Sequence, residues 1–516
     1  MHAAEWEEKL KEALPHTEER ILANRKKIEE RIRMEQSKIK RFSVRSAAAV
    51  FVMALAAVLV IAKPDLLRSG YDWMKSLSGG KAVVTADPLD DGDEKSLKVL
   101  VYMNESNFMD KYGRLIMLKK PNIAFDIVIY KYDYNQQDKA YGELKRQIEI
   151  EKPDLIYLSD VTNWYGRLVK DGFLVELDPL IKKDKFDLDS LHPSVPSTIR
   201  AMGDGKLHAL APTMKSKALF YNKDMFDQYQ IPYPRSKMSW EELLVLASQF
   251  PAKKPDLYGL QASGENDPFQ AVDLLSAVHA LSPISKDGTK VDLQTNEWRQ
   301  LWNTVIAEYK NKTLYNRPGM EQGKSYSLSD LAKMNGFLSG KTAMEITSHT
   351  ELGEIAKMKE NGLKPFSIGI VTVPVEPGSS DAEGVYGLDD LLAVSANSEN
   401  RQAAWEVLRY INSDEMAQLL PKAKIYNAFR RNQYPLLSRP SAMIPVAGID
   451  PKPFYELKAA IEKSGRKRIP NSLSGMWASN GSEELRAVLD GSKHANDALI
   501  SLESKLQQQF TKTSKP

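Results

Sequence analysis

Short apolar runs alternate regularly with helical stretches between residues 97 and 158. The apolar runs are Leu97–Met103, Ile123–Tyr132 and Pro153–Leu158, and helical patterns lie between them at about 107–119 and 138–150. Each run is short and almost continuously apolar, which is typical of strands that are buried on both faces. The order strand, helix, strand, helix, strand predicts a parallel sheet covered by helices on both faces, so the fold class is α/β.

Polar and aromatic residues follow two of these predicted strands. Asn104 and Glu105 come after the first run, and Asp160 and Trp164 come after the third. Ligands of parallel sheets bind beyond the carboxyl ends of the strands, where carboxylates and amides can bind hydroxyls and a flat ring can pack on an apolar face. We therefore predict these four as ligand-binding residues. Two alternatives stay open, because such a carboxylate can cap a helix and such an indole can belong to the core.

A second set of elements follows, and its clearest marker is a helix start. Ser239 and Glu242 have the spacing of a capping box, in which each side chain binds the main-chain N–H of the other residue. The apolar periodicity further predicts helices at 267–281, 295–310, 327–338 and 399–411, strands at 368–373 and 391–394, and a C-terminal helix. No internal repeat relates this set to the first one.

The uncharged segment Ser46–Ala62 is long enough to cross a membrane, because a helix of this length rises about 25 Å. Basic residues crowd its upstream flank and are sparse downstream, so the positive-inside rule places the N-terminus in the cytoplasm. We predict a charged helical cytoplasmic tail at 1–45, a single transmembrane anchor at 46–62 and a linker at 63–96. A cleaved signal peptide is one alternative, since Val60-Ile61-Ala62 resembles a cleavage site, and a buried core helix is another.

Composition argues against several classes of function. The chain has no cysteine, and its seven histidines include no pair at the i, i+4 spacing of a helical zinc site. The net charge is +3, without a sustained basic face beyond the N-terminal tail, so we expect no nucleic acid partner. No nucleophile elbow or nucleophile–base pattern is visible. We therefore expect no metal, no cofactor and no enzymatic activity.

Four passages, in order along the chain, resemble one protein family. They are Gly205–Phe226 with its Leu-x-Tyr-Asn-Lys-Asp pattern, Met238–Leu243, Phe337–Met344 with Phe-x-x-Gly-Lys-x-Ala-Met, and Ala403–Leu408 with Ala-Ala-Trp. These passages are similar to motifs of the solute-binding proteins of ATP-binding-cassette (ABC) importers. The branch that they resemble binds sugars and oligosaccharides and includes maltose-binding protein.

The resemblance implies a two-lobed, periplasmic-binding-protein-like fold of type II, and a non-catalytic role. It implies a solute-binding domain at 97–516, with a first lobe at about 97–212 plus 390–450, a second lobe at about 217–385 and C-terminal helices at 453–511. The implied partners are a small solute, a sugar or oligosaccharide, and the permease subunits of an ABC importer. Family members are usually tethered through a lipidated cysteine, which this chain lacks.

Two departures from the family pattern concern the ligand. Where many members carry a Gly-x-Trp turn, this chain has Ser348-His349-Thr350. The return crossing between the lobes carries Tyr386 and the pair Asp389-Asp390, which we predict as ligand-binding residues. In a strand the two carboxyls would face opposite ways, so at most one would reach the ligand. Such carboxylates suit a cationic or heavily hydroxylated ligand.

Trp477 completes the predicted site, because it lies in a segment that resembles the family's late stacking aromatic; core packing is the alternative. We thus predict a membrane-anchored extracellular protein that captures a small solute, expected to be a carbohydrate, by hinge closure for an ABC importer. One alternative is a membrane-fixed ligand sensor or scaffold that signals through its cytoplasmic tail. Another is a structural protein that keeps the fold and has lost its ligand.

Overall fold

The computed structural model describes residues 94–131, 137–158, 161–262, 267–279, 281–317, 323–379, 386–422, 434–459, 469 and 471–513. The chain divides into two units, Met1–Ala86 and Asp87–Pro516, and all described residues belong to the second. The predicted tail, anchor and most of the linker therefore lie outside the described residues. Within the described ranges, no helix has both the length and the apolar character that crossing a membrane requires.

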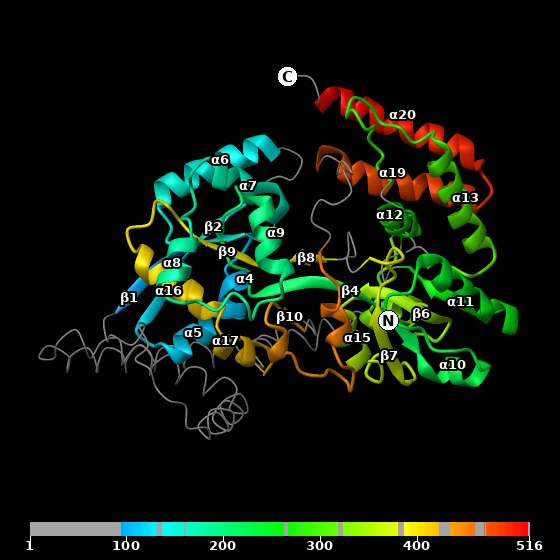
Figure 1. Cartoon of the computed structure of the whole chain (residues 1–516), viewed down its shortest axis with the longest axis horizontal. Helices are drawn as coiled ribbons and strands as arrows, with labels where there is room; N and C mark the ends of the chain where they lie inside the picture. Colours follow the sequence, from blue (N-terminus) through cyan, green and yellow to red (C-terminus); the bar gives the residue numbers. More distant parts are fainter. Residues whose placement is uncertain are drawn as a thin grey trace, which may run out of the picture. The chain divides into compact units, whose positions relative to one another are not determined.

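The first of two sheets has the strand order β2-β1-β3-β9 (Figure 1). Its strands are β1 (Lys95–Tyr102), β2 (Ile123–Tyr130), β3 (Leu155–Leu158) and β9 (Leu391–Val394). β1 pairs in parallel with both β2 and β3, which confirms the predicted parallel arrangement, and β9 joins β3 antiparallel. Three successive residues of β1, Val99 to Val101, are fully buried, so both faces of this sheet are covered.

Helices surround this sheet to form the first lobe. They are α6 (Gln137–Glu151), α7 (Val161–Lys170), α8 (Asp178–Lys183), α9 (Ser194–Met202), α16 (Arg401–Ile411) and α17 (Asp414–Leu419). α16 contacts β1 and β9, and α6 contacts β2. α16 realises the predicted amphipathic helix, since Ala404, Val407 and Leu408 are fully buried.

The helix predicted near 107–119 forms, but its middle is a π-helix. Short helices α4 (Ser106–Phe108) and α5 (Arg114–Lys119) flank the π-helical turn η2 (Met109–Gly113). A π turn holds an extra residue and changes which side chains face inward, and such turns are frequent at functional sites. Here all five residues of η2 are buried, including Asp110 and Lys111.

The second sheet is built around one long strand, β4. Its strands are β4 (Thr213–Asn222), β5 (Tyr258–Gln261), β6 (Thr342–Ser348), β7 (Ile368–Thr372), β8 (Tyr386–Leu388) and β10 (Leu436–Leu437). β4 runs antiparallel to β6, β7, β8 and β10, whereas β5 and β6 are parallel. The first half of β4 pairs with β8 and β10, and the second half with β6 and β7.

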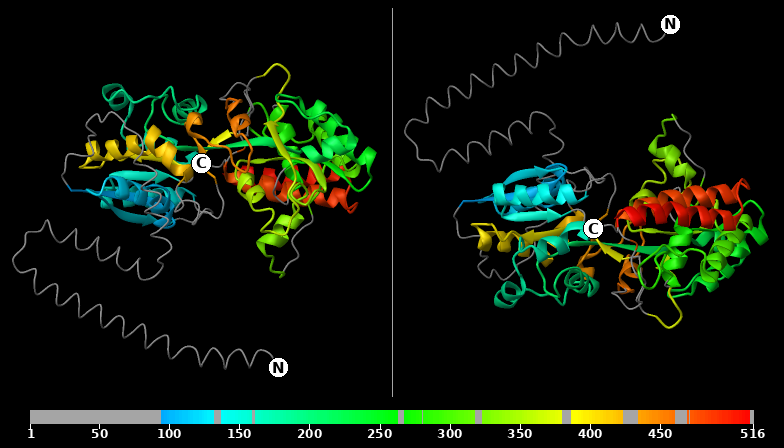
Figure 2. Two further views of the ribbon diagram at one scale, coloured as in Figure 1. Left: turned by 90° about the horizontal axis from the view of Figure 1, so that it is seen from below. Right: turned by 90° about the horizontal axis from the view of Figure 1, so that it is seen from above.

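The second lobe adds a thick helical layer to this sheet. Its helices are α10 (Lys223–Tyr229), α11 (Trp240–Lys253), α12 (Phe269–Val278), α13 (Asn296–Lys310), α14 (Leu328–Met334), α15 (Glu351–Ala356), α19 (Asn471–Leu489) and α20 (Ala495–Thr513). α19 and α20 form a pair against α12 and α13, red against green in Figure 2. The capping box of Ser239 and Glu242 at α11 is confirmed.

Alternate residues of β4 enter two different hydrophobic cores. Met214, Ala218 and Phe220 pack into the core of the first lobe, whereas Leu219 and Tyr221 pack into that of the second. This division follows from the period of two along a strand. Around the start of β4 the chain passes between the lobes, and an isolated bridge joins Leu210 to Leu392 beside β9. We call this junction of β4, β8 and β10 the crossing region.

Candidate functional site

The acidic pair Asp389-Asp390 lies in the crossing region, in the short connection between β8 and β9. The two carboxyls differ in burial, although both lie near the Lys111 ammonium, at 3.7 Å for Asp389 and 2.5 Å for Asp390. Asp390 is 1% exposed, whereas the Asp389 side chain is 23% exposed. Only Asp389 is therefore accessible to a solute.

Asp390 is the centre of a buried polar cluster. Its carboxylate accepts hydrogen bonds from the Lys111 ammonium at 2.5 and 2.6 Å, from the Tyr112 hydroxyl at 2.7 Å, from the Tyr157 hydroxyl, and from the Thr213 hydroxyl at 3.2 Å. These partners come from the π turn, from β3 and from β4. The cluster therefore ties the core of the first lobe to the strand that leads into the second.

This environment gives Asp390 a structural role. Burial alone would raise the pKa of its carboxyl, but the charge of Lys111 and the hydrogen bonds from Lys111, Tyr112 and Tyr157 outweigh burial and lower that pKa. A buried ion pair is tolerated only when hydrogen bonds satisfy both partners, as they do here. Asp390 thus has no accessible carboxylate to offer, and its placement corrects the expectation that it contacts the ligand.

Asp389 faces two ammonium groups. Its oxygens lie 3.7 Å from Lys111 Nζ and 3.4 Å from Nζ of Lys215, a half-exposed side chain on β4. Two carboxylates therefore stand beside two lysines, and their formal charges cancel. The acidic pair therefore gives no preference for a cationic ligand, whereas the Asp389 carboxylate can still accept hydrogen bonds from hydroxyl groups.

His349, the residue that replaces the family's aromatic turn, is buried next to this group. It is 6% exposed and immediately follows β6. Burial lowers the pKa of His349 to about 4, and the opposing charges of Asp389 and Lys215 modify this shift, so the ring is neutral at pH 7. Its Nδ1 is buried and has no hydrogen-bond partner among the described residues.

The unpartnered Nδ1 of His349 leaves one hydrogen-bonding position open. A nitrogen of a neutral imidazole either donates or accepts, depending on the tautomer. An unpaired buried polar group costs about 1–3 kcal/mol, so a hydroxyl group that bonds to Nδ1 in either direction would stabilise the site.

Tyr386 contributes a second unpaired group. Its hydroxyl oxygen is buried without a partner among the described residues, and burial raises the pKa of the phenol, which keeps its proton. The ring stacks on His192 with centroids 6.0 Å apart and planes at 25°, and His192 also contacts the ring of Tyr455. Unlike Tyr386, Tyr455 has a satisfied hydroxyl, which donates to the Leu437 carbonyl at 2.9 Å.

A second buried carboxyl group lies close to His349. Glu351, in the first turn of α15, is 8% exposed, and burial together with the charge of Glu354 raises its pKa to about 7. Its neighbour Glu345 on β6 is fully buried and accepts hydrogen bonds from Gln261 and Asn335. Burial raises the pKa of Glu345 well above its usual value. Glu351 therefore titrates near neutrality beside a carboxyl group whose pKa is also raised.

The predicted residues of the first lobe lie elsewhere. Asn104 and Glu105 are exposed after β1, and Glu105 makes no capping hydrogen bond, so capping does not explain it. Between them and β1, Met103 has a left-handed φ of 69° and is half-exposed. Asp160 lies outside the described residues. The loop at Asn104 and Glu105 therefore remains a proposed ligand contact.

Both predicted stacking tryptophans are core residues in this structure. Trp164 is 2% exposed and packs on Tyr130, with ring centroids 6.0 Å apart. Trp477 on α19 is 4% exposed, packs edge-on against Phe269 and Trp298, and donates its indole N–H to Asp273. These placements favour the core-packing alternative for both rings.

The structure thus places Asp389 near three residues that sequence reasoning did not select, Lys111, Lys215 and His349. Lys111 gave no signal, because a lysine in an apolar helix pattern is normally solvated. His349 was visible in the sequence as a departure, since it stands where many family members carry a Gly-x-Trp turn. Lys215 gave no signal, because it lies in a run of polar residues at the start of β4. We call Lys215, His349, Tyr386 and Asp389, which lie on or directly after β4, β6 and β8, the crossing cluster.

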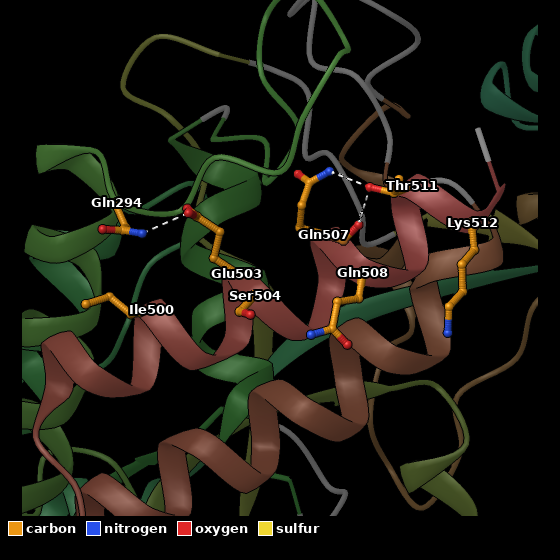
Figure 3. Close-up of a pocket in the computed structure, with 8 residues that line it drawn as sticks. All are labelled: Gln294, Ile500, Glu503, Ser504, Gln507, Gln508, Thr511 and Lys512. Atoms are coloured by element: carbon orange, nitrogen blue, oxygen red, sulfur yellow. Dashed lines mark hydrogen bonds between the residues drawn. The ribbon is translucent and has the colours of Figure 1, made fainter. Parts of the chain in front are cut away.

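A groove of about 620 Å³ beside α20 offers no comparable arrangement (Figure 3). Its amides and carboxylate already bind one another: Gln294 donates to Glu503 at 2.8 Å, and Gln507 donates to Thr511 at 3.1 Å. Metal coordination finds no support either, since within the described ranges no three acidic or histidine side chains converge. The crossing cluster is therefore the candidate site.

Comparison with known proteins gives the same fold. The chain is similar to a binding protein of Brucella abortus strain 2308, at 25% identity over 350 residues that cover 66% of this chain and 77% of the relative. A sugar transporter from Rhizobium etli, in an open conformation, shares 20% identity with a TM-score of 0.53 over 80% of this chain and 99% of its own. The sugar-binding protein MalE from Xanthomonas citri shares 15% identity with a TM-score of 0.56, covering 81% and 98%.

These likenesses establish the two-lobed α/β fold, and a family profile extends them to the sequence. The profile of the bacterial extracellular solute-binding proteins matches residues 118–418, which is more than half of the chain. The matched region runs from the first lobe through the second sheet, apart from β10, to α17, and it contains the crossing cluster. The chain therefore belongs to the bacterial extracellular solute-binding proteins.

Proposed function

We propose that this protein captures a small polyhydroxylated solute, a carbohydrate, outside the cell and delivers it to the permease of an ABC importer. The observation that carries the proposal is the pair of unpaired buried groups, His349 Nδ1 and the Tyr386 hydroxyl, where β4 and β8 link the two sheets. Membership of the family supports solute binding, and the names of similar structures support a sugar as the solute.

The chemistry of the crossing cluster fits hydroxyl groups. His349 Nδ1 can share a hydrogen bond with a hydroxyl, the Tyr386 phenol donates or accepts, and the partly exposed Asp389 carboxylate accepts a hydrogen bond from a further hydroxyl. The neighbouring lysines balance the carboxylates, so a neutral solute brings no unpaired charge into the site. A neutral polyol satisfies these groups better than a cation does.

Capture would proceed by hinge closure. The crossing cluster lies on strands that connect the sheets, and His192 of the first lobe stacks on Tyr386 of the second sheet. A solute that contacts both lobes only in the closed form shifts the population toward that form. The closed form would then dock on the permease.

The stacked tyrosines provide a test with a matched control. Tyr386→Phe removes a hydroxyl that has no partner, and Tyr455→Phe removes one that already binds Leu437. A thermal-shift panel of sugars first identifies a binder, since a solute at 100 times its Kd adds about 2.7 kcal/mol to the free energy of unfolding. Isothermal titration should then show weaker binding by Tyr386→Phe and by His349→Phe, and unchanged binding by Tyr455→Phe.

Two results would contradict this function. If no sugar or other polyol shifts the melting temperature, the chain keeps the fold without a carbohydrate ligand. If Tyr455→Phe weakens binding as much as Tyr386→Phe does, the hydroxyl of Tyr386 has no specific role and the site lies elsewhere.

The proposal includes a single-pass anchor at 46–62, which would hold the binding domain on the outer surface with the tail inside. The support is the apolar segment and the asymmetry of its basic flanks. Protease added to intact cells should remove the domain after Lys63 and spare the tail before Arg45. A secreted product that begins near Lys63 would instead indicate a cleaved signal peptide.

A further inference from the structure

The strand β2 forms one edge of the first sheet. Among the described strands it pairs only with β1, in a register that runs without interruption from Ile123 to Tyr130. Edge strands of monomeric proteins are usually short or carry lysine, proline or a bulge, which discourage pairing with another chain. β2 has eight residues, its register contains no bulge, and Asp126 is its single charged residue. This edge lacks the usual protection against a further strand.

The main-chain groups at this edge can be identified from the hydrogen bonds on its other side. The N–H of Met103, directly after β1, donates to the Tyr130 carbonyl at 3.0 Å, so the even-numbered residues of β2 face β1. The Gln147 side chain donates to the Ile129 carbonyl at 3.2 Å from outside the sheet, which agrees with this alternation. The residues whose N–H and C=O groups point to the free edge are Phe125, Ile127 and Ile129.

Exposed apolar side chains lie at both ends of this edge. Met117 and Leu118 belong to α5, which contacts β2, and Leu118 is 62% exposed. α5 ends beside the start of β2, where the Ile123 N–H donates to the Lys120 carbonyl at 3.0 Å. Ile129, which is 41% exposed, lies at the carboxyl end of the strand. Each end of the edge therefore offers apolar surface to a partner.

We propose that β2 pairs antiparallel with β2 of a second copy of this chain, so that the first sheets of two copies join edge to edge. A second copy fits because antiparallel pairing brings the carboxyl end of each strand beside the amino end of the other. Ile129 of each copy then lies near Met117 and Leu118 of the other copy. The same strand thus supplies both halves of the contact, and each half covers apolar surface that a single copy exposes.

The register of this pair follows from the outward-facing groups. Centring it on Ile127 places Ile127 opposite its own copy and Phe125 opposite Ile129, so all three outward-facing residues of each strand find partners. An aromatic residue opposite a β-branched one is a favourable cross-strand pair, and the symmetry provides it twice. Centring one residue earlier would place Asp126 directly opposite its own copy, where like charges are destabilising.

This interface leaves the candidate solute site accessible. The strand order β2-β1-β3-β9 puts β2 at one edge of the sheet and β9 at the other, and the connection that carries Asp389 leads directly into β9. The pairing does not depend on the proposed solute, so each inference can fail without the other.

Single cysteines can test the register, because the chain contains no cysteine of its own. Ile127→Cys places two thiols at the twofold axis, in a hydrogen-bonded pair whose Cα atoms lie about 5.5 Å apart, within the range of a disulfide. The control is Ala124→Cys, which is more exposed but lies about 20 Å from its own copy in this register. Mild oxidation of the purified full chain by copper-phenanthroline in air should give covalent dimers of Ile127→Cys and leave Ala124→Cys monomeric.

Ile129→Lys gives a second readout. A lysine at an exposed edge position opposes strand pairing without entering the core. This variant should sediment as a monomer where the detergent-solubilised wild-type chain sediments as a dimer, and it should slow the cross-linking of Ile127→Cys at least tenfold. The matched control is Val245→Lys, which adds the same charge at a 66% exposed position of α11 and should leave both measurements unchanged.

Three results would overturn the proposal. If the wild-type chain is monomeric and Ile127→Cys forms no dimer, a second copy does not occupy this edge, and a segment of the same chain or another protein is left as its partner. If Ala124→Cys cross-links as fast as Ile127→Cys, the contacts are random collisions. If Ile129→Lys remains a dimer, the copies associate through another surface, such as the apolar segment 46–62.

Discussion

Replacing Lys111 by methionine should strongly destabilise the first lobe. The substitution keeps the length of the side chain but leaves Asp390 as a fully buried carboxylate without its ammonium partner, which lies 2.5 Å away. Removing one member of a buried ion pair typically costs about 3–5 kcal/mol. Tyr112, Tyr157 and Thr213 still donate to the carboxylate, so we expect the lower end of that range, about 3 kcal/mol.

The assay is urea denaturation followed by tryptophan fluorescence, in which the midpoint falls while the slope stays that of the wild type. The control is Lys206→Met, which removes a lysine from the solvated pair with Glu176, where N and O lie 2.7 Å apart. That pair is exposed on both sides, so its loss should have a much smaller effect. The double variant Lys111→Met/Asp390→Asn should recover much of the lost stability, since it removes both charges.

The reasoning is refuted if Lys111→Met and Lys206→Met have equal effects. It is also refuted if the effects of Lys111→Met and Asp390→Asn simply add in the double variant, because coupled charges cannot give independent losses. Either result would mean that the crossing region is held by apolar packing alone.

Three further predictions concern the second lobe. Trp477→Ala should lower the free energy of unfolding by about 3–5 kcal/mol and leave solute affinity unchanged in isothermal titration; weaker affinity at unchanged stability would restore a stacking role. For Glu351 the folded pKa is raised from 4.5 to about 7, so its contribution to stability is fully present below pH 4.5 and is lost as the pH rises to about 7. The variant Glu351→Gln should not show this loss of stability. If its melting temperature changes between pH 5 and 8 in parallel with that of the wild type, this prediction is contradicted. Ser239→Ala should cost about 1 kcal/mol in urea denaturation, and no change would show that the capping box contributes nothing.

The elements that the sequence predicts well are those whose pattern is local. The apolar run at 97–103 becomes a strand that is buried on both faces, because such a strand needs only continuous apolar residues. The run at 123–132 becomes the parallel edge strand β2, most of which is only partly buried. The helix start at Ser239 forms because both hydrogen bonds of the capping box lie within four residues. Such features depend only on residues that are close along the chain, so they can be predicted from a single sequence.

The site depends on residues far apart in the sequence, and there local patterns fail. Lys111 is buried only because Asp390, 279 residues later, supplies the opposite charge. Trp477 has an aromatic ring that could stack on a ligand. In the fold, however, Phe269 and Trp298, which belong to other helices, pack against this ring. The missing partner of His349 Nδ1 is likewise a property of the surrounding fold, which spacing along the chain does not reveal.

Because β4 contributes to two hydrophobic cores, the two lobes cannot easily be separated into independent fragments. Met214, Ala218 and Phe220 belong to one core, and Leu219 and Tyr221 belong to the other. A fragment that carries either lobe alone would expose one apolar face of its longest strand to water and would tend to aggregate. Recombination that exchanges one lobe between relatives must therefore preserve the buried residues on both faces of this single strand.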